Sequence, residues 1–255
     1  MRGPLDDIRG KVILHQPIIR NMRRLIQSAV FILFAIAVLA VAAATHLAAQ
    51  SPAASINNEP HHKRLLYTND LRLWDVTLPP GQSTQPFVHE YDVATVVIGD
   101  GMLNIQRNGE TVTPSAPNAR GSVIVAEHTG APATYRIENS GTTEYRAFEV
   151  ENMHDAGKWA AGAPFTAPGS SVLKDSRAFT VYDLALKAGD PPAMHPHTGA
   201  VIVVLVSGTL EQDGIGGEEP VRIQQPGQWL VLPRFQSHTV AAIGGDAHAV
   251  EIEVR

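Results

Sequence analysis

Two histidines separated by one residue stand directly before an apolar run in the stretch MHPHTGAVIVVLVSG, residues 194–208. In a β-strand the side chains of residues i and i+2 point to the same face, so His195 and His197 would project together. Two imidazoles on one face suit a divalent metal ion. His238, which follows a short apolar segment bounded by prolines, offers a third ligand from a neighbouring strand. The alternative is that these are surface histidines in turns.

The segments that would position these residues read as β-strands. From residue 65 onward, short runs rich in β-branched and aromatic residues, such as LRLWDVTL, ATVVIG and YRAFEVE, are separated by clusters of Gly, Pro and Asn. The pair Asn108-Gly109 predicts a hairpin turn, because both residues tolerate a positive φ. The sequence therefore predicts an all-β protein.

The chain also repeats itself. WDVTLPPG at 74–81 matches YDLALKAG at 182–189, and three further segments recur in the same order at offsets of 102 to 108 residues. Such a repeat predicts two homologous all-β domains. We place the first domain at residues 63–152 and the second at 176–255. Residues 153–175 are expected to be a linker, and residues 50–62 a flexible segment.

The histidine pair lies in a pattern that resembles the first motif of the cupin superfamily. That motif is Gly, five residues, His-x-His, three or four residues, Glu, six residues and Gly. Here Gly189, His195, His197 and Gly208 stand at these positions, but Val201 replaces the Glu. The second motif is similar as well. Gly227, Pro233 and His238 match it, whereas Phe235 stands in place of a Gly and Ala242 in place of an Asn.

The resemblance covers both repeats and is closest to two-barrel bicupins of the quercetin-dioxygenase type. It implies two tandem jelly-roll β-barrels and a divalent metal ion, Fe, Mn or similar, held by His195, His197 and His238. With Val201 in place of the Glu, the site would carry one more positive charge than a four-ligand site and would favour an anionic ligand. Glu211 is one carboxylate that could replace the missing ligand.

The apolar strand after the histidines has two apolar faces. One face, Val201, Val203 and Leu205, would line a substrate pocket beside the metal. The opposite face, Ile202, Val204 and Val206, suits packing against another barrel. No general base or other catalytic residue can be named from the sequence.

The first repeat has lost most of the motif. Phe87 stands at the first His position and His89 at the second, so we expect a structural barrel without metal, with His89, Glu90, Glu127 and His128 as polar rim residues. The remaining histidines are weaker candidates for a site. His61 and His62 are expected in a solvated tail, His154 between the domains, and His248 in a strand.

The N-terminus reads as a leader. Basic residues at 20–24 precede an uncharged apolar run at 25–44 and a small-residue segment, which is typical of a secretory signal; we place cleavage after Ala49. The run is long enough to be an uncleaved membrane anchor instead. Either reading places the protein outside the cytoplasm, periplasmic, secreted or anchored to the inner membrane through residues 25–44.

Composition excludes several functions. The chain has no cysteine, so thiol catalysis, Cys-zinc sites and disulfides are excluded. Residues 50–255 hold 14 basic and 23 acidic side chains, a net charge of −9, so we expect no nucleic-acid partner. The expected partner is a small molecule, with a homodimer as an open possibility.

Three functions follow as hypotheses. The first is an exported metal-dependent enzyme that acts on a small anionic or chelating molecule, with oxygenation as the leading reaction because the cupin superfamily includes dioxygenases. The second is a non-catalytic cupin of the cell envelope that binds a small ligand. The third is a structural role in which the barrels serve as interaction surfaces.

Overall fold

The computed structural model describes residues 53–115, 117–154, 163–213 and 219–255. These residues form β-strands and a single short 3₁₀ helix, so the predicted all-β class is confirmed. In the described ranges no helix is long and apolar enough to cross a membrane. The expected leader, residues 1–49 with its apolar run at 25–44, lies outside the described residues.

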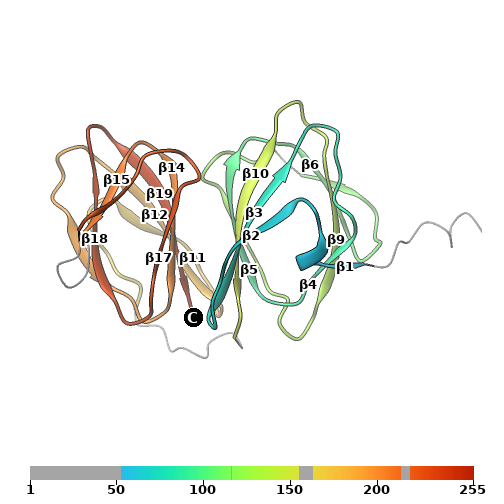
Figure 1. Cartoon of the computed structure of the whole chain (residues 1–255), viewed down its shortest axis with the longest axis horizontal. Coiled ribbons are helices and arrows are strands. Elements are labelled where there is room, and N and C mark those ends of the chain that lie inside the picture. The colour runs from blue at the N-terminus through green and yellow to red at the C-terminus, as the bar shows by residue number, and fades with distance from the viewer. Residues whose placement is uncertain (1–52, 116, 155–162, 214–218) are drawn as a thin grey trace, which may run out of the picture. The chain divides into compact units, whose positions relative to one another are not determined.

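The first half of the described chain is a barrel of two sheets. One sheet has the order β2-β3-β10-β5-β8 and the other β1-β4-β9-β6-β7 (Figure 1). The elements are β1 (Ala54–Ser55), η1 (Ile56–Asn58), β2 (His62–Tyr67), β3 (Leu71–Leu78), β4 (Phe87–His89), β5 (Val93–Gly99), β6 (Leu103–Arg107), β7 (Thr113–Pro114), β8 (Val123–Ala126), β9 (Ala133–Asn139) and β10 (Tyr145–Asn152).

The second half repeats this plan with the sheets β11-β12-β19-β14-β17 and β13-β18-β15-β16. Its strands are β11 (Ser170–Asp175), β12 (Phe179–Leu186), β13 (Ala193–Pro196), β14 (Val201–Ser207), β15 (Leu210–Asp213), β16 (Val221–Ile223), β17 (Trp229–Leu232), β18 (Ser237–Ala242) and β19 (Ala247–Val254). The repeat seen in the sequence is therefore a repeat of strand order, and the prediction of two tandem barrels is confirmed.

The two faces of β14 are buried in different cores. Val201, Val203 and Leu205 belong to the interior core of the second barrel. Ile202 and Val204 belong to a core that also contains residues of the first barrel, Leu73 among them. The apolar outer face of this strand is thus explained by packing against the other barrel, and the two barrels belong to one compact unit.

A buried amide reinforces this contact. The side-chain Nδ2 of Asn152, at the end of β10, donates hydrogen bonds to the carbonyl oxygens of Ala178, at 3.2 Å, and Arg255, at 2.9 Å. Asn152 is fully buried, so these bonds satisfy polar groups that could not otherwise reach water.

Two expected boundaries are corrected. In the segment 50–62, expected to be flexible, residues 54–55 pair with β4 and residues 56–58 form η1. The apolar contacts of the buried Ile56 explain why residues 54–58 take a defined position on the barrel. The C-terminal part of the expected linker 153–175 is β11, an outer strand that pairs with β12. By contrast, the Asn108-Gly109 turn forms as expected, with φ angles of 49° and 73°.

Candidate metal centre

His195 lies in β13 and His197 directly after its end, and both side chains are buried in the second barrel. Each is 3% exposed, and their ring centroids are 5.0 Å apart. The backbone N–H of His197 donates a 2.8 Å hydrogen bond to the carbonyl oxygen of Gln236, which continues the pairing beyond the end of β13. The alternating geometry expected from the His-x-His spacing is therefore present.

His238 approaches from the neighbouring strand. It stands directly opposite His195 in the antiparallel pair of β13 and β18. Its Nε2 lies 3.2 Å from Nε2 of His197, and the residue is 2% exposed. The turn that leads into β18 places Phe235 at a φ of 59°, a conformation in which a glycine would be unstrained. The structure thus brings together all three histidines selected from the sequence.

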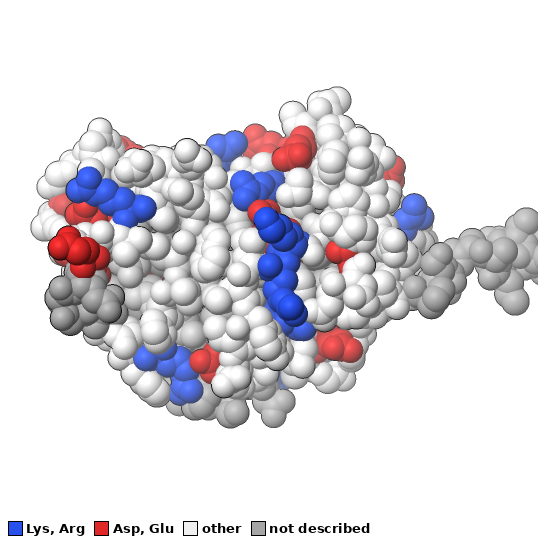
Figure 2. All heavy atoms as spheres, in the orientation of Figure 1, with Lys and Arg blue, Asp and Glu red and all other residues white. Residues whose placement is uncertain are grey.

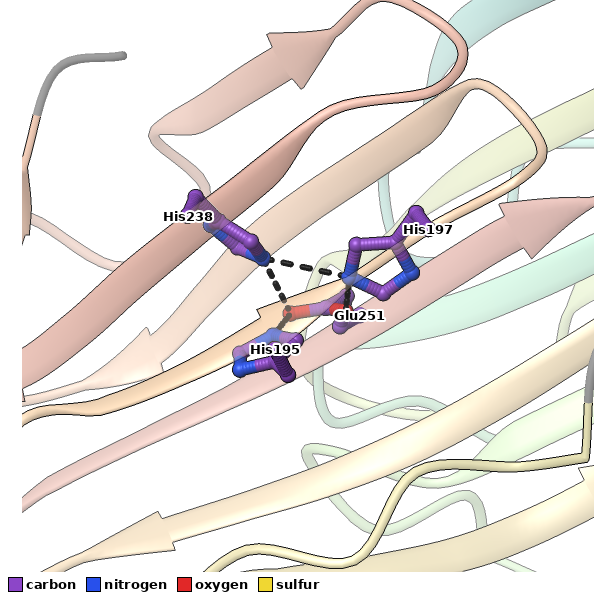
Figure 3. A group of neighbouring side chains, drawn as sticks. All are labelled: His195, His197, His238 and Glu251. Carbon is purple, nitrogen blue, oxygen red and sulfur yellow. Dashed lines mark hydrogen bonds and ion pairs between the residues drawn. The ribbon is translucent and has the colours of Figure 1, made fainter.

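A fourth residue completes the group and was missed in the sequence. Glu251 of β19 is fully buried, and its Oε1 lies 2.7 Å from His197 Nε2. Its Oε2 lies 3.4 Å from His195 Nε2 and 3.5 Å from His238 Nε2. One ligand atom from each of the four residues lies within 4.8 Å of the others (Figure 3).

The expectation of a three-histidine site is therefore corrected. Glu251 pairs with Val203 across the β14–β19 ladder, so its carboxylate enters from the strand beside the one that carries Val201. Glu211, suggested as a replacement, is instead paired with Arg222 on β15 and β16. The signal in the sequence was the run AHAVEIEV, in which two glutamates alternate with apolar residues. The apolar residues of this strand are typical of a hydrophobic core, so the two carboxylates stand out.

The electrostatics of the four residues are coupled. Burial alone would raise the pKa of Glu251, but the three imidazoles outweigh it and hold this pKa well below its ordinary value. Burial likewise opposes a charged His197, yet Glu251 and Glu253 raise its pKa to about 9. Burial, with the neighbouring His195 and His197, lowers the pKa of His238. A buried carboxylate thus faces three imidazoles, two of which differ sharply in proton affinity.

Glu253 supports the centre from behind His197. Its Oε2 lies 3.2 Å from His197 Nδ1. Its Oε1 accepts hydrogen bonds of 2.9 Å from the backbone N–H groups of Thr198 and Gly199, and one of 3.1 Å from the Thr198 hydroxyl. Burial would raise the pKa of Glu253, but His197 and these N–H groups lower it. An imidazole held at Nδ1 by a carboxylate presents Nε2 to a metal in a fixed orientation.

The substrate pocket predicted along Val201, Val203 and Leu205 stays a prediction. Val201, Val203 and Leu205 are fully buried in the barrel core and do not line the cavity that reaches His195. That cavity is bordered instead by residues of the linker, β12 and β18, among them Phe165, Leu184, Leu186, Lys187, His195 and Val240. Its free volume is about 10 Å³, roughly the room of one water molecule.

Phe165 narrows this approach. Its ring is stacked on the imidazole of His195, with centroids 3.9 Å apart. The same ring is also stacked on the ring of Tyr182, with centroids 4.1 Å apart. Phe165 comes from the segment expected to be a linker, so this residue of the segment covers one side of the candidate metal centre.

The other described histidines lie outside this group, and His61 is half-buried with its Nδ1 2.9 Å from the carbonyl oxygen of Thr77. His154 and His248 form ion pairs near the surface, with Asp70 and Asp183 respectively. His62, His89 and His128 are buried inside the first barrel, which corrects the expectations of a solvated tail and of rim positions. Glu90 and Glu127 are exposed, as expected of rim residues.

Comparison with known proteins supports the fold. No model of a known protein family matches the sequence, and no curated protein matches it. Solved structures do match. A cupin 2 conserved barrel domain protein from Leptotrichia buccalis has a TM-score of 0.50 and 14% identity, covering 76% of this chain and 88% of that protein. AerE from Microcystis aeruginosa has a TM-score of 0.54 and 14% identity, with coverages of 77% and 98%.

A third match is an enzyme. Salicylate 1,2-dioxygenase from Pseudaminobacter salicylatoxidans has a TM-score of 0.57 and 11% identity, with 75% of each chain covered. At these identities the matches show a shared fold. The predicted cupin resemblance is confirmed at this level: the chain has a fold of paired cupin-type barrels.

Proposed function

We propose that the second barrel binds a divalent transition-metal ion and presents it to a small anionic or chelating molecule, as a dioxygenase-like enzyme. The observation that carries this proposal is the convergence of His195, His197, His238 and Glu251, all buried, with their ligand atoms within 4.8 Å of one another. Buried charged groups in proteins are paired with one another or coordinate a metal, and the convergence of four ligand atoms favours the metal.

The donor set fits this class of metal. Three imidazoles and one carboxylate suit Fe, Mn, Zn and similar divalent ions, and Glu253 supplies the carboxylate that orients a ligating imidazole. One carboxylate against a divalent ion leaves a net charge of +1, which favours an anionic ligand. When bound, the ion would act as a Lewis acid toward that ligand and, if redox-active, would allow chemistry with O₂.

The residues around the entrance suit an amphipathic molecule. Leu184, Leu186 and Val240 provide an apolar wall, and Lys187 stands at the rim, paired with Asp246. An aromatic acid would place its ring against this wall and its carboxylate on the metal ion, whose net charge favours an anion. The structural similarity to salicylate 1,2-dioxygenase, one of whose structures contains gentisate, supports this class of ligand.

The alternative is a binding protein without turnover. This alternative is favoured by the narrow approach to the four residues, because the ring of Phe165 is stacked on the imidazole of His195.

For the enzyme and for the binding protein alike, we propose that the protein acts outside the cytoplasm, on the basis of the leader at residues 1–49. On the face shown in Figure 2, Lys and Arg form a narrow column and scattered groups, which offers no argument for a nucleic-acid partner.

The proposal is tested first by metal content. The protein without a His tag is purified and loaded with Fe(II), Mn(II) or Zn(II), and the bound ion is counted for the wild type, His195→Ala and Glu251→Gln. His154→Ala serves as the control, because this histidine pairs with Asp70 away from the centre. A metal retained by wild type and control but lost in His195→Ala is expected. No metal in the wild type under any loading condition would overturn the proposal.

Oxygen uptake then separates the enzyme from the binding protein. The loaded protein is offered hydroxylated aromatic acids and enols, and consumption of O₂ is compared with ligand binding measured by calorimetry. Binding without O₂ uptake or product would support the alternative. Sequencing the N-terminus of the mature protein tests export separately.

A further inference from the structure

One ring nitrogen of His238 faces the candidate metal centre, and the other is buried without a hydrogen bond. Nε2 lies 3.2 Å from Nε2 of His197 and 3.5 Å from Oε2 of Glu251 (Figure 3). Nδ1 is shielded from solvent, and no described residue forms a hydrogen bond with it. An imidazole that binds a metal through Nε2 carries its proton on Nδ1, and this N–H almost always donates to a nearby acceptor. Nδ1 of His238 therefore needs an acceptor when an ion is bound.

The carboxylate that serves His197 is not available for this task. One oxygen of Glu253 contacts Nδ1 of His197 at 3.2 Å. The other accepts hydrogen bonds from the backbone N–H groups of Thr198 and Gly199. Both oxygens of Glu253 are thus engaged, so the acceptor for His238 has to come from another strand.

Gln212 of β15 carries a buried amide oxygen that also lacks a hydrogen bond. In β15 the residues Leu210 and Gln212 are buried, whereas the two that follow them are not. Leu210 belongs to the interior core of the second barrel, so Gln212, two positions later in the strand, also faces the interior. Gln212 is 8% exposed, and across the described ranges no group donates to its Oε1. Such an atom is rare in a folded protein and calls for a partner.

The strand register places Gln212 beside His238. Gln212 is directly opposite Val240 in the antiparallel pair of β15 and β18. Val240 and His238 are the two buried residues at alternate positions of β18, so both face the same side of that strand. Diagonal neighbours of this kind are about 7–8 Å apart, within reach of a long side chain. Because β18 lies between β13 and β15, Gln212 approaches His238 from the side opposite His195.

The two unsatisfied atoms have complementary chemistry. The amide oxygen of glutamine only accepts hydrogen bonds, and the Nδ1–H of a metal-bound imidazole only donates. While Nε2 of His238 is free, either ring nitrogen can carry the proton. An ion on Nε2 fixes the proton on Nδ1 and so gives Oε1 of Gln212 a donor. The amide is neutral, so it would hold the ring without changing the net charge at the centre.

We propose that Gln212 is a positioning residue for the metal ligand His238, whose Nδ1–H donates a hydrogen bond to Oε1 of Gln212 when the centre holds its ion. This inference rests on the proposed function, because it requires an ion at Nε2. It gives the second barrel two ligands that are oriented from behind, His197 by the carboxylate of Glu253 and His238 by the amide of Gln212.

The test compares metal affinity with the state of the His238 proton in the full chain without a His tag. Gln212→Met removes the acceptor and keeps the length of the side chain, whereas Gln212→Glu keeps an acceptor oxygen. Gln106→Met is the matched control, because the Gln106 amide on β6 donates to the carbonyl oxygen of Glu110 instead. Circular dichroism shows whether each variant is folded, and Gln212→Leu, a second apolar replacement, covers the case in which Gln212→Met does not fold.

Two quantities are measured with Zn(II). Competition with a chelator gives the affinity, which should fall about 10- to 100-fold in Gln212→Met and should not fall in Gln212→Glu or Gln106→Met. NMR of the labelled, Zn(II)-loaded protein follows the Nδ1–H proton of His238, assigned by through-bond correlations within that residue. A slowly exchanging signal is expected in the wild type, in Gln212→Glu and in Gln106→Met, and its loss in Gln212→Met.

The outcomes separate this inference from the proposed function. Equal Zn(II) affinity in the wild type and Gln212→Met would overturn the role of Gln212 and leave the metal centre intact. A weaker affinity with an unchanged His238 signal would also overturn it, because the loss would then come from packing. A wild type that binds no metal would overturn the proposed function, and this inference with it.

Discussion

Glu253 holds the imidazole of His197 on the side away from the metal-binding group, with Oε2 3.2 Å from Nδ1. Its other oxygen is fixed by the backbone N–H groups of Thr198 and Gly199. The carboxylate therefore ties the imidazole to the backbone directly after it. It does not enter the group formed by His195, His197, His238 and Glu251, so its role is to position a ligand.

Replacement of Glu253 by Gln should weaken metal binding without abolishing it. The amide removes the charge and one acceptor while keeping the shape, and loss of such an orienting partner typically costs about 10- to 100-fold in metal affinity. Competition with a chelator of known affinity measures the change. Glu211→Gln, which alters a carboxylate paired with Arg222, is the control. Equal affinities for Glu253→Gln and the wild type would exclude the positioning role.

Truncation of Phe165 should open the approach to the second-barrel metal. The ring is stacked on His195 and Tyr182, and the cavity beside it has a volume of only about 10 Å³. In Phe165→Ala a chelator should remove the metal faster than from the wild type, and a small aromatic acid should bind faster. Stopped-flow absorbance of the Co(II)-loaded protein measures both rates. Leu173→Ala, at an exposed position on β11, should leave them unchanged; if Phe165→Ala does so too, the ring does not control access.

Phe235 provides a prediction about stability. It is 71% exposed and adopts a φ of 59°, a conformation that costs a residue with a Cβ about 1–2 kcal/mol. Phe235→Gly should remove this strain, and Phe235→Ala should keep it. Because glycine also loses more backbone entropy on folding, by about 0.5–1 kcal/mol, we expect Phe235→Gly to be more stable than Phe235→Ala by about 0.5–1 kcal/mol.

Urea unfolding of the metal-free proteins measures this difference. Metal-free protein is used so that no ion bound by the nearby His238 contributes to the free energy of unfolding. The ring contact with the guanidinium of Arg234 is lost in both variants and cancels in the comparison. If Phe235→Gly were the less stable of the two, the left-handed conformation would not be a source of strain.

Local patterns were sufficient to predict part of the centre. The His-x-His spacing placed His195 and His197 on one face, and the proline-bounded strand brought His238 opposite them, because these features depend on neighbouring residues. The unbroken apolar run likewise predicted both buried faces of β14. Such signals survive in a single sequence because strand geometry has a period of two.

Other buried ionisable residues depend on contacts between distant segments. Glu251 enters the centre through the register of β19 against β14, which joins residues about 50 positions apart and leaves no local trace. His62 is buried because β2 pairs with β3; in the sequence it stood in the polar run HHKR and resembled a tail. The only hint in the sequence that Glu251 and His62 are buried is a charged residue or a histidine next to an apolar strand.

Ile202 tests whether the two barrels fold as one unit. It is fully buried in the core that contains residues of both barrels, and it faces away from the metal centre. Ile202→Ala leaves a cavity that should cost about 2–5 kcal/mol of unfolding free energy. Because the core is shared, the thermal unfolding of wild type and variant should each remain a single transition, measured by calorimetry on the metal-free proteins. Val221→Ala, at an exposed position of β16, is the control. Two separated transitions in the variant, with one unchanged from the wild type, would show that the barrels unfold independently and that their contact contributes little to stability.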